Sequence, residues 1–131
     1  MAPDFSPEGK VAFRMFTAAS AIGRRLEAGG IGRIASAGDV IVGYAELTAP
    51  ARWQERVAHL NLLFVEPDRH RRGIARALLD ALVATARPGA ITVNASAYAG
   101  PAYRRLGFVP TGDLGWRHGM PCVPMRRDLP G

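Results

Sequence analysis

The chain has 131 residues, a length that predicts one domain with its own hydrophobic core. Hydrophobic residues make up 48% and charged residues 21%, which argues against bulk disorder. The 17 basic residues outnumber the 11 acidic ones, for a net charge of +6, and Lys10 is the only lysine. Such an arginine excess suits an anionic partner, namely nucleic acid, acidic lipid or a phosphorylated cofactor, although a coding bias toward arginine would give the same composition.

The cysteine content and the hydropathy of the chain argue against several kinds of site and of protein. Cys122 is the only cysteine, so the chain can hold neither an internal disulfide nor a cysteine-rich zinc site, and no metal site is expected. No apolar run approaches the roughly 18–20 residues of a membrane-spanning helix. Residues 1–10 are polar and lack the basic-then-apolar order of a secretory signal. We therefore expect a cytoplasmic protein that does not associate with membranes.

The first predicted element is helical. It begins near Ser6-Pro7-Glu8, where a capping serine, a proline suited to the first turn and an acidic residue follow one another. Gly29 and Gly30 end it. The weak helix former Thr17 within it leaves open whether it is one helix or two. Its apolar stripe comprises Val11, Met15, Ala19, Ile22 and Leu26.

Three strands follow the helical segment. Residues 31–37 and 40–48 predict a hairpin, because a tight Gly38-Asp39 turn separates two apolar runs. Residues 57–65 are almost continuously apolar, which is typical of a central strand.

The second half of the chain alternates helix and strand. Residues 73–87 predict the clearest helix, with a leucine-rich buried face and an exposed Arg76–Asp80 pair four residues apart. The order of elements predicts an α/β protein with a mixed sheet that is covered on both faces. The remaining predicted elements are a strand at 90–95, a helix at 100–106, and strands at 108–111 and 122–127 around a loop at 112–121.

The stretch from residue 59 to residue 79 carries the most specific chemical signal. A buried strand leads into a basic loop, and Gly73 then opens a helix whose first N–H groups lack internal partners. Gly73 and Ala75 are small, so a ligand can approach the backbone closely. These features describe a phosphate cradle, with Arg71, Arg72 and Arg76 nearby to neutralise charge. A solvated turn that merely caps a helix is the alternative interpretation.

The same stretch resembles a known family. Val65-x-Pro67, the basic loop, Gly73-x-Ala75 and the leucine-rich helix are similar to motif A of the GNAT superfamily of N-acetyltransferases. The resemblance covers about residues 8–129. It extends to residues 93–96 with Tyr103 and Gly107-Phe108, which are similar to motif B, to residues 41–46, which are similar to the third strand, and to Val123–Met125 with Leu129, which are similar to the closing strand.

This resemblance implies a fold and a cofactor. It implies a single N-acetyltransferase domain over residues 1–131, built on a central mixed, mostly antiparallel sheet of about six strands. The strands at 57–65 and 90–95 would splay apart and admit the pantetheine arm of acetyl-CoA. The implied cofactor-binding residues are Leu63, Phe64 and Val65 at the pantetheine and thioester, His70, Arg71, Arg72, Gly73, Ile74, Ala75 and Arg76 at the pyrophosphate, and Asn94, Ser96 and Tyr103 in the second motif.

One residue departs from the family pattern. His70 occupies the position where the superfamily has glutamine or arginine, three residues before Gly73. Backbone amides bind phosphate whatever that side chain is, so cofactor binding should survive, and His70 could itself donate a hydrogen bond to phosphate.

Acetyl transfer to an amine also needs a proton acceptor and a proton donor. The resemblance implies Tyr103 as general acid beside the sulfur, and packing of its ring is the alternative. His59, with a reference pKa of about 6.5, and Glu46 are the candidate bases, and a reaction with no dedicated base stays open. Asn94 has either a structural role or a hydrogen bond to the pantetheine, and Ser96 can cap the segment that follows.

We therefore expect transfer of an acetyl group from acetyl-CoA to a primary amine of a small molecule or peptide, by direct attack in a ternary complex. The alternative from a different class is a catalytically silent acyl-CoA sensor of the same fold. A nucleic-acid-binding domain is less favoured because residues 69–76 already serve the cofactor. The pairs Arg24-Arg25 and Arg104-Arg105 leave an RNA-linked amine open. Trp53 and Trp116 could border the acceptor, and a homodimer could complete its pocket.

Overall fold

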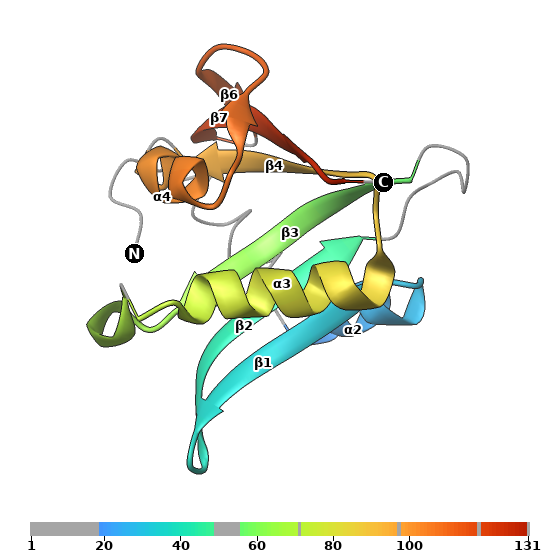
Figure 1. The fold of residues 1–131 in the computed structure, drawn as a ribbon, viewed down its shortest axis with the longest axis vertical. Helices are drawn as coiled ribbons and strands as arrows, with labels where there is room; N and C mark the ends of the chain where they lie inside the picture. Colours follow the sequence, from blue (N-terminus) through green and yellow to red (C-terminus); the bar gives the residue numbers. More distant parts are fainter. Residues whose placement is uncertain (1–18, 49–55, 71, 97, 118, 131) are drawn as a thin grey trace.

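The computed structural model describes residues 19–48, 56–70, 72–96, 98–117 and 119–130. Within these residues, seven strands form one sheet in the order β1-β2-β3-β4-β7-β5, and β6 pairs with β7 (Figure 1). The strands are β1 (Ile31–Ala37), β2 (Val40–Thr48), β3 (Val57–Val65), β4 (Ala90–Ser96), β5 (Val109–Pro110), β6 (Gly115–Arg117) and β7 (Met120–Asp128). The helices are α2 (Ala19–Glu27), α3 (Ile74–Ala86), α4 (Gly100–Arg105) and the 3-10 turn η1 (Pro67–Arg69).

Helices lie on both faces of the sheet, as predicted. Helix α3 packs on β1, β2 and β3, and α2 lies behind the same strands in Figure 1. The approach of α3 depends on Gly43, because a Cβ there would lie 3.1 Å from Leu78 Cδ1 and 3.0 Å from Phe64 O. Since side chains alternate along a strand, Tyr44 and Glu46 then face α2 on the opposite side.

The sheet is divided where β3 and β4 separate. These two strands pair in parallel only from Val57 opposite Ala90 to His59 opposite Thr92, and beyond that point they diverge (Figure 1). All the other pairings are antiparallel, and β4 pairs with β7 along its whole length. The predicted splay of the strands at 57–65 and 90–95 is therefore confirmed.

A β-bulge in β3 begins just past the last parallel pair. Glu46 of β2 is opposite Leu62, whereas Leu47 is opposite Leu60, so Asn61 is an extra residue on β3. A bulge bends its strand and increases the local twist. Its position next to His59 explains how β3 turns away from β4 while it stays paired with β2.

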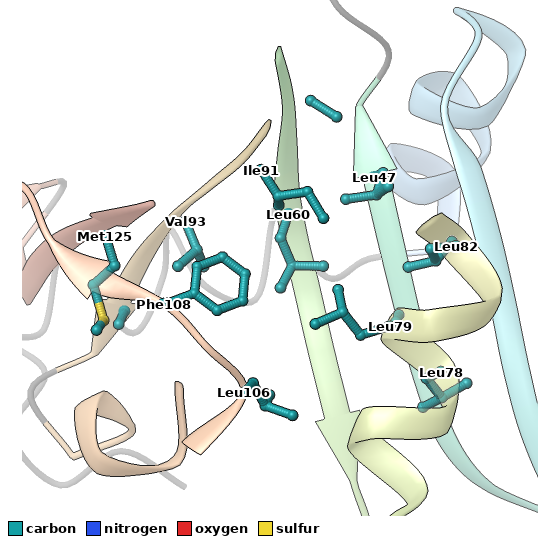
Figure 2. Packing of buried hydrophobic residues seen from close by; sticks show 13 residues of the cluster. Leu47, Leu60, Leu78, Leu79, Leu82, Ile91, Val93, Leu106, Phe108 and Met125 are labelled. Carbon is teal, nitrogen blue, oxygen red and sulfur yellow. The ribbon is translucent and has the colours of Figure 1, made fainter. Parts of the chain in front are cut away.

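One buried cluster spans the divergence (Figure 2). Leu79 and Leu82 of α3 are fully buried against the sheet. Phe108, 1% exposed, directs its ring between Val93 of β4 and Leu60 of β3 in Figure 2. Because the strands no longer touch here, large side chains take over the packing between the two halves of the sheet.

Most predicted element boundaries are confirmed, and two expectations were wrong. The strands at 31–37, 40–48 and 57–65 match to the residue. The loop predicted at 112–121 contains the short strand β6, which carries Trp116. The expected Arg76–Asp80 pair is absent from the described residues, because the Arg76 guanidinium donates to Arg105 O at 2.6 Å. The predicted helix start and Trp53 lie outside the described residues.

No helix among the described residues is long and apolar enough to cross a membrane.

Candidate active site

The loop that joins β3 to α3 folds back on the end of the strand. Glu66 N donates to Val42 O at 2.8 Å, and η1 follows directly. The ring Nε2 of His70 lies 2.8 Å from Val65 O, so a protonated Nε2 donates to that carbonyl. His70, which sequence reasoning assigned to phosphate, therefore also fixes the loop to the end of β3.

Gly73 opens α3 in a left-handed conformation, with φ of 76°. A Cβ at Gly73 would have no heavy atom within 4 Å, so the space above this residue is open. The first-turn amides of Ile74, Ala75 and Arg76 have no acceptor within the helix, and the helix dipole adds partial positive charge there. An anion can therefore reach bare backbone donors at this point.

The arginines around this turn are placed differently from one another. Arg72 is exposed and Arg69 is half-buried, so both can add charge to the turn. Arg76 instead joins the first turn of α3 to the C-terminal end of α4 through Arg105 O. Arg71 lies outside the described residues.

The diverging edges of β3 and β4 lead to this turn. Beyond His59 and Thr92, the facing backbone groups of the two strands have no partner strand in the part of the chain that the structure describes. Leu63 and Val65 pack against the core on the α3 side, whereas Phe64 is 53% exposed on the other face. Such an edge offers donors and acceptors to the amides of an extended ligand.

The second predicted motif lies at the end of β4. Asn94 is exposed, and Ser96 Oγ accepts a hydrogen bond from Ala99 N at 3.1 Å in the turn before α4, whose N-cap is Ala99. The Tyr103 ring on α4 packs edge to face on Phe108, with centroids 5.5 Å apart. Burial raises the pKa of Tyr103 to about 12, so its hydroxyl keeps its proton at neutral pH.

His59 sits at the last parallel pair. Its Nδ1 lies 2.8 Å from Thr92 Oγ1, and that hydroxyl can donate to Ala58 O at 3.5 Å. In that arrangement Nδ1 carries the proton and Nε2 keeps the lone pair that a base needs. Burial, and then the positive charge of Arg117, lower the pKa of His59 and favour the neutral ring.

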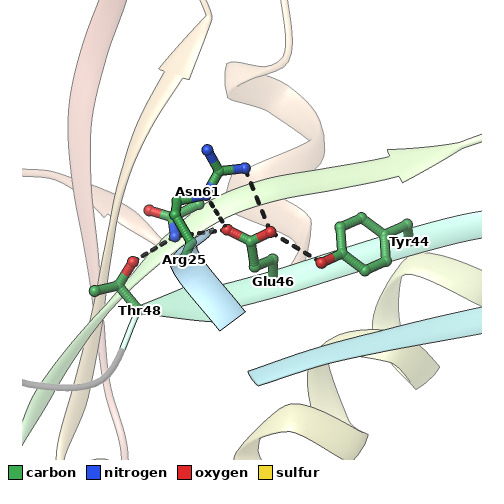
Figure 3. A network of polar contacts seen from close by, with 5 residues as sticks. All are labelled: Arg25, Tyr44, Glu46, Thr48 and Asn61. Atoms are coloured by element: carbon green, nitrogen blue, oxygen red, sulfur yellow. Dashed lines mark hydrogen bonds and ion pairs between the residues drawn. The ribbon is translucent and has the colours of Figure 1, made fainter. Parts of the chain in front are cut away.

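Glu46 is fully buried at the centre of a polar network (Figure 3). Arg25 of α2 donates from Nε at 2.5 Å, Tyr44 Oη at 2.9 Å and Asn61 Nδ2 at 2.9 Å. Asn61 also donates to Thr48 Oγ1. Burial alone would raise the pKa of Glu46, but the hydrogen bonds from Arg25, Asn61 and Tyr44 and the charge of Arg25 hold it below its usual range.

Comparison with known proteins identifies this architecture. The family model described as an acetyltransferase (GNAT) domain matches residues 1–129. The chain belongs to the GNAT acetyltransferase family. A search of the curated proteins gave no match.

Solved structures have the same GNAT fold. A GCN5-related N-acetyltransferase from Rhodopseudomonas palustris is 27% identical, with a TM-score of 0.73 over 96% of this chain and 78% of that one. A GNAT-family acetyltransferase from Desulfovibrio desulfuricans is 24% identical, with a TM-score of 0.71 over 97% and 85%. PaiA N-acetyltransferase from Thermoplasma acidophilum, solved with coenzyme A, is 15% identical, with a TM-score of 0.77 over 95% and 80%.

Within this GNAT domain, the predicted site residues fall into two groups. His59, Tyr103 and the Gly73 turn border the diverging strands, whereas Glu46 lies in the network beneath α2. Sequence reasoning missed Arg25 and Arg117, whose partners are distant in sequence. The alternation of Tyr44 and Glu46 along one strand was the one local signal for the network.

We expect Glu46→Gln to lower the free energy of unfolding at pH 7 by about 1–3 kcal/mol, because Arg25 loses a charged partner. The folded-state pKa of Glu46 is lowered, so its contribution is complete above the unfolded value of about 4.3 and disappears as pH falls through the folded pKa. Urea unfolding from pH 7 to pH 3 should therefore show the two proteins converging.

Asp128→Asn is the matched control, because Asp128 pairs with Arg126 at 2.8 Å while its side chain is 78% exposed. It should change stability by less than about 0.5 kcal/mol. A constant gap between wild type and Glu46→Gln down to pH 3 would contradict the assigned charge state.

Proposed function

We propose that this GNAT domain transfers an acetyl group from acetyl-CoA to a primary amine of a small molecule or peptide in a ternary complex. The observation that carries the proposal is the divergence of β3 and β4 after His59 and Thr92, which opens along β3 toward the loop that ends at the free amides following Gly73. Membership of the acetyltransferase family supports the same class of reaction.

The described residues fit the cofactor. Open space at Gly73 leaves the amides of Ile74 and Ala75 accessible to a pyrophosphate, and Arg72 adds positive charge. The backbone of residues 63–65 offers edge groups for the pantetheine amides, and Asn94 is exposed on the strand that diverges from it. Bound acetyl-CoA supplies the activated acetyl thioester.

The remaining roles fall to two side chains in suitable protonation states and to one backbone N–H. In the proposed reaction, His59 Nε2 accepts a proton from the attacking amine as the N–C bond forms. A backbone N–H on the free edge of β3 stabilises the negative charge that develops on the carbonyl oxygen. Tyr103 gives its proton to the departing thiolate as the C–S bond breaks, a role supported by its protonated state at neutral pH.

Glu46 is the weaker of the two candidate bases. Both of its oxygens accept hydrogen bonds, and the lowered pKa reduces its affinity for a proton. His59 combines a neutral ring with a free-base nitrogen in the arrangement described above. We therefore assign proton acceptance to His59 and a positioning role to Glu46.

The acceptor amine is proposed to bind on the α2 side of the sheet. Phe64 is 53% exposed there, and the β6–β7 hairpin brings Trp116, 66% exposed, and Arg117, whose charge acts on His59. An aromatic border of this kind suits an amine that carries an apolar group.

The first experiment measures free thiol released from acetyl-CoA with a panel of amines and aminoacyl compounds, and binding of coenzyme A by calorimetry. We expect binding and amine-dependent release. Binding of coenzyme A with no thiol release for any amine would favour the silent acyl-CoA module. No binding of coenzyme A would overturn both the enzyme and the sensor as functions of this domain.

We expect Tyr103→Phe to lower kcat by about 100-fold with little change in the KM for acetyl-CoA, because it removes the proton donor and keeps the ring that packs on Phe108. Tyr98→Phe is the matched control, since Tyr98 is 89% exposed. Steady-state kinetics compare the two variants. An unchanged kcat in Tyr103→Phe would contradict the role of Tyr103 as general acid and leave only the packing of its ring.

We expect Gly73→Ala to weaken coenzyme A binding by about 10-fold, because a methyl group would stand over the amides and a left-handed alanine costs about 1–2 kcal/mol. Gly38→Ala is the control: it has φ of 60° and equally open surroundings, but lies in the β1–β2 turn. Both variants should lose similar stability by urea unfolding. Equal coenzyme A affinity in the two variants would contradict the proposal that the amides after Gly73 bind the pyrophosphate.

A further inference from the structure

A cavity lies at the end of α3 opposite the Gly73 turn. It has a volume of about 510 Å³, within the range of small-molecule sites. The last turn of α3, the start of β3 and the end of β7 meet at this side of the molecule (Figure 1). Three arginines, Arg56, Arg87 and Arg127, line it together with apolar groups such as Val83 and Leu129, and no described acidic residue does.

Arg127 lines this cavity and also carries an unsatisfied donor. Its Nη1 atom is buried and has no hydrogen-bond partner, the one such side-chain atom among the described residues. The chain of Arg127 is confined, because a Cβ on Gly107 would lie 3.4 Å from its Cδ and Nε. A buried charged donor without a partner costs stability unless a ligand or counter-ion satisfies it.

The other two arginines are held in uncommon backbone conformations. Arg56 and Arg87 have φ of 49° and 48°, the only non-glycine residues of the described chain with positive φ. Arg56 Nη2 donates to Arg87 O at 2.6 Å, which connects the start of β3 to the end of α3. Left-handed residues other than glycine are strained and occur preferentially at functional sites.

Positive charge at this cavity is not neutralised by the described part of the protein. The two ion pairs among the described residues involve Arg25 and Arg126, and neither arginine lines the cavity. The C-terminal dipole of α3 contributes only about half a negative charge against three guanidinium groups. A ligand with at least two negative charges would therefore balance the site best.

We propose that this cavity binds a multiply charged oxyanion, a phosphate or polycarboxylate group of a small molecule whose apolar part rests on Val83 and Leu129. Planar guanidinium groups match the oxygens of both anions. The site is separate from the Gly73 cradle, because 13 residues of α3 span about 20 Å. It is independent of the proposed acetyl transfer.

The test titrates inorganic phosphate and citrate into the full chain at constant ionic strength, with calorimetry and thermal unfolding as readouts. Wild type should bind at least one anion and melt at a higher temperature with it. Arg127→Met should weaken that binding at least 10-fold and, without anion, unfold at a higher temperature than wild type, because it removes the unpaired charge. Comparing the two anions distinguishes a phosphate site from a polycarboxylate site.

Arg126→Met is the matched control: it removes the same charge from β7 at an exposed neighbouring position and should bind the anion like wild type. Gly73→Ala should also bind it normally, which separates this site from the cradle. Arg87→Gln tests the same site at an exposed position if Arg127→Met does not fold.

Two results would overturn the proposal. The first is that wild type shows no anion binding beyond chloride. The second is that Arg127→Met and Arg87→Gln retain wild-type affinity.

Discussion

The structure depends on three parallel residue pairs between β3 and β4. Backbone N–H and C=O groups in a sheet interior normally find partners, but after His59 and Thr92 the groups on the facing edges of β3 and β4 have no partner strand among the described residues. The two halves of the sheet remain together because Phe108 and the leucines of α3 fill the core between them. Unsatisfied strand edges next to a packed core form a fixed place for an extended ligand with its own amides, which is the requirement of a pantetheine arm.

The Glu46 network keeps this divergence in register. Asn61 is the extra residue of the β3 bulge, and its amide is held by Glu46 of β2 and by Thr48. Arg25 brings α2 to the same carboxylate. An apolar residue at position 46 could pack in this space, but it would hold neither the bulge nor the helix, so the buried charge contributes to specificity of arrangement more than to stability.

The parts of this site that follow local rules could be predicted from sequence. The strand of residues 57–65, the glycine that opens α3 and the Ser96 hydrogen bond in the turn before α4 each depend on residues within a few positions. The Arg25–Glu46 pair could not be predicted, because its members are 21 residues apart and lie on different elements. Strand β6 was missed because Gly-Trp-Arg has no strand pattern and forms only by pairing with β7.

Helix α3 has a left-handed residue at each end, and the two residues differ in a way that matters for charge. At Gly73 the absence of a side chain exposes backbone donors, so affinity for an anion comes from amides and the helix dipole. At Arg87 the dipole opposes an anion, and only guanidinium groups can reverse the local potential. Arginines at the Gly73 end therefore supplement a site that the backbone already forms, whereas those at the Arg87 end must create one. This difference explains why removing a single guanidinium should matter more at Arg127 than at Arg72.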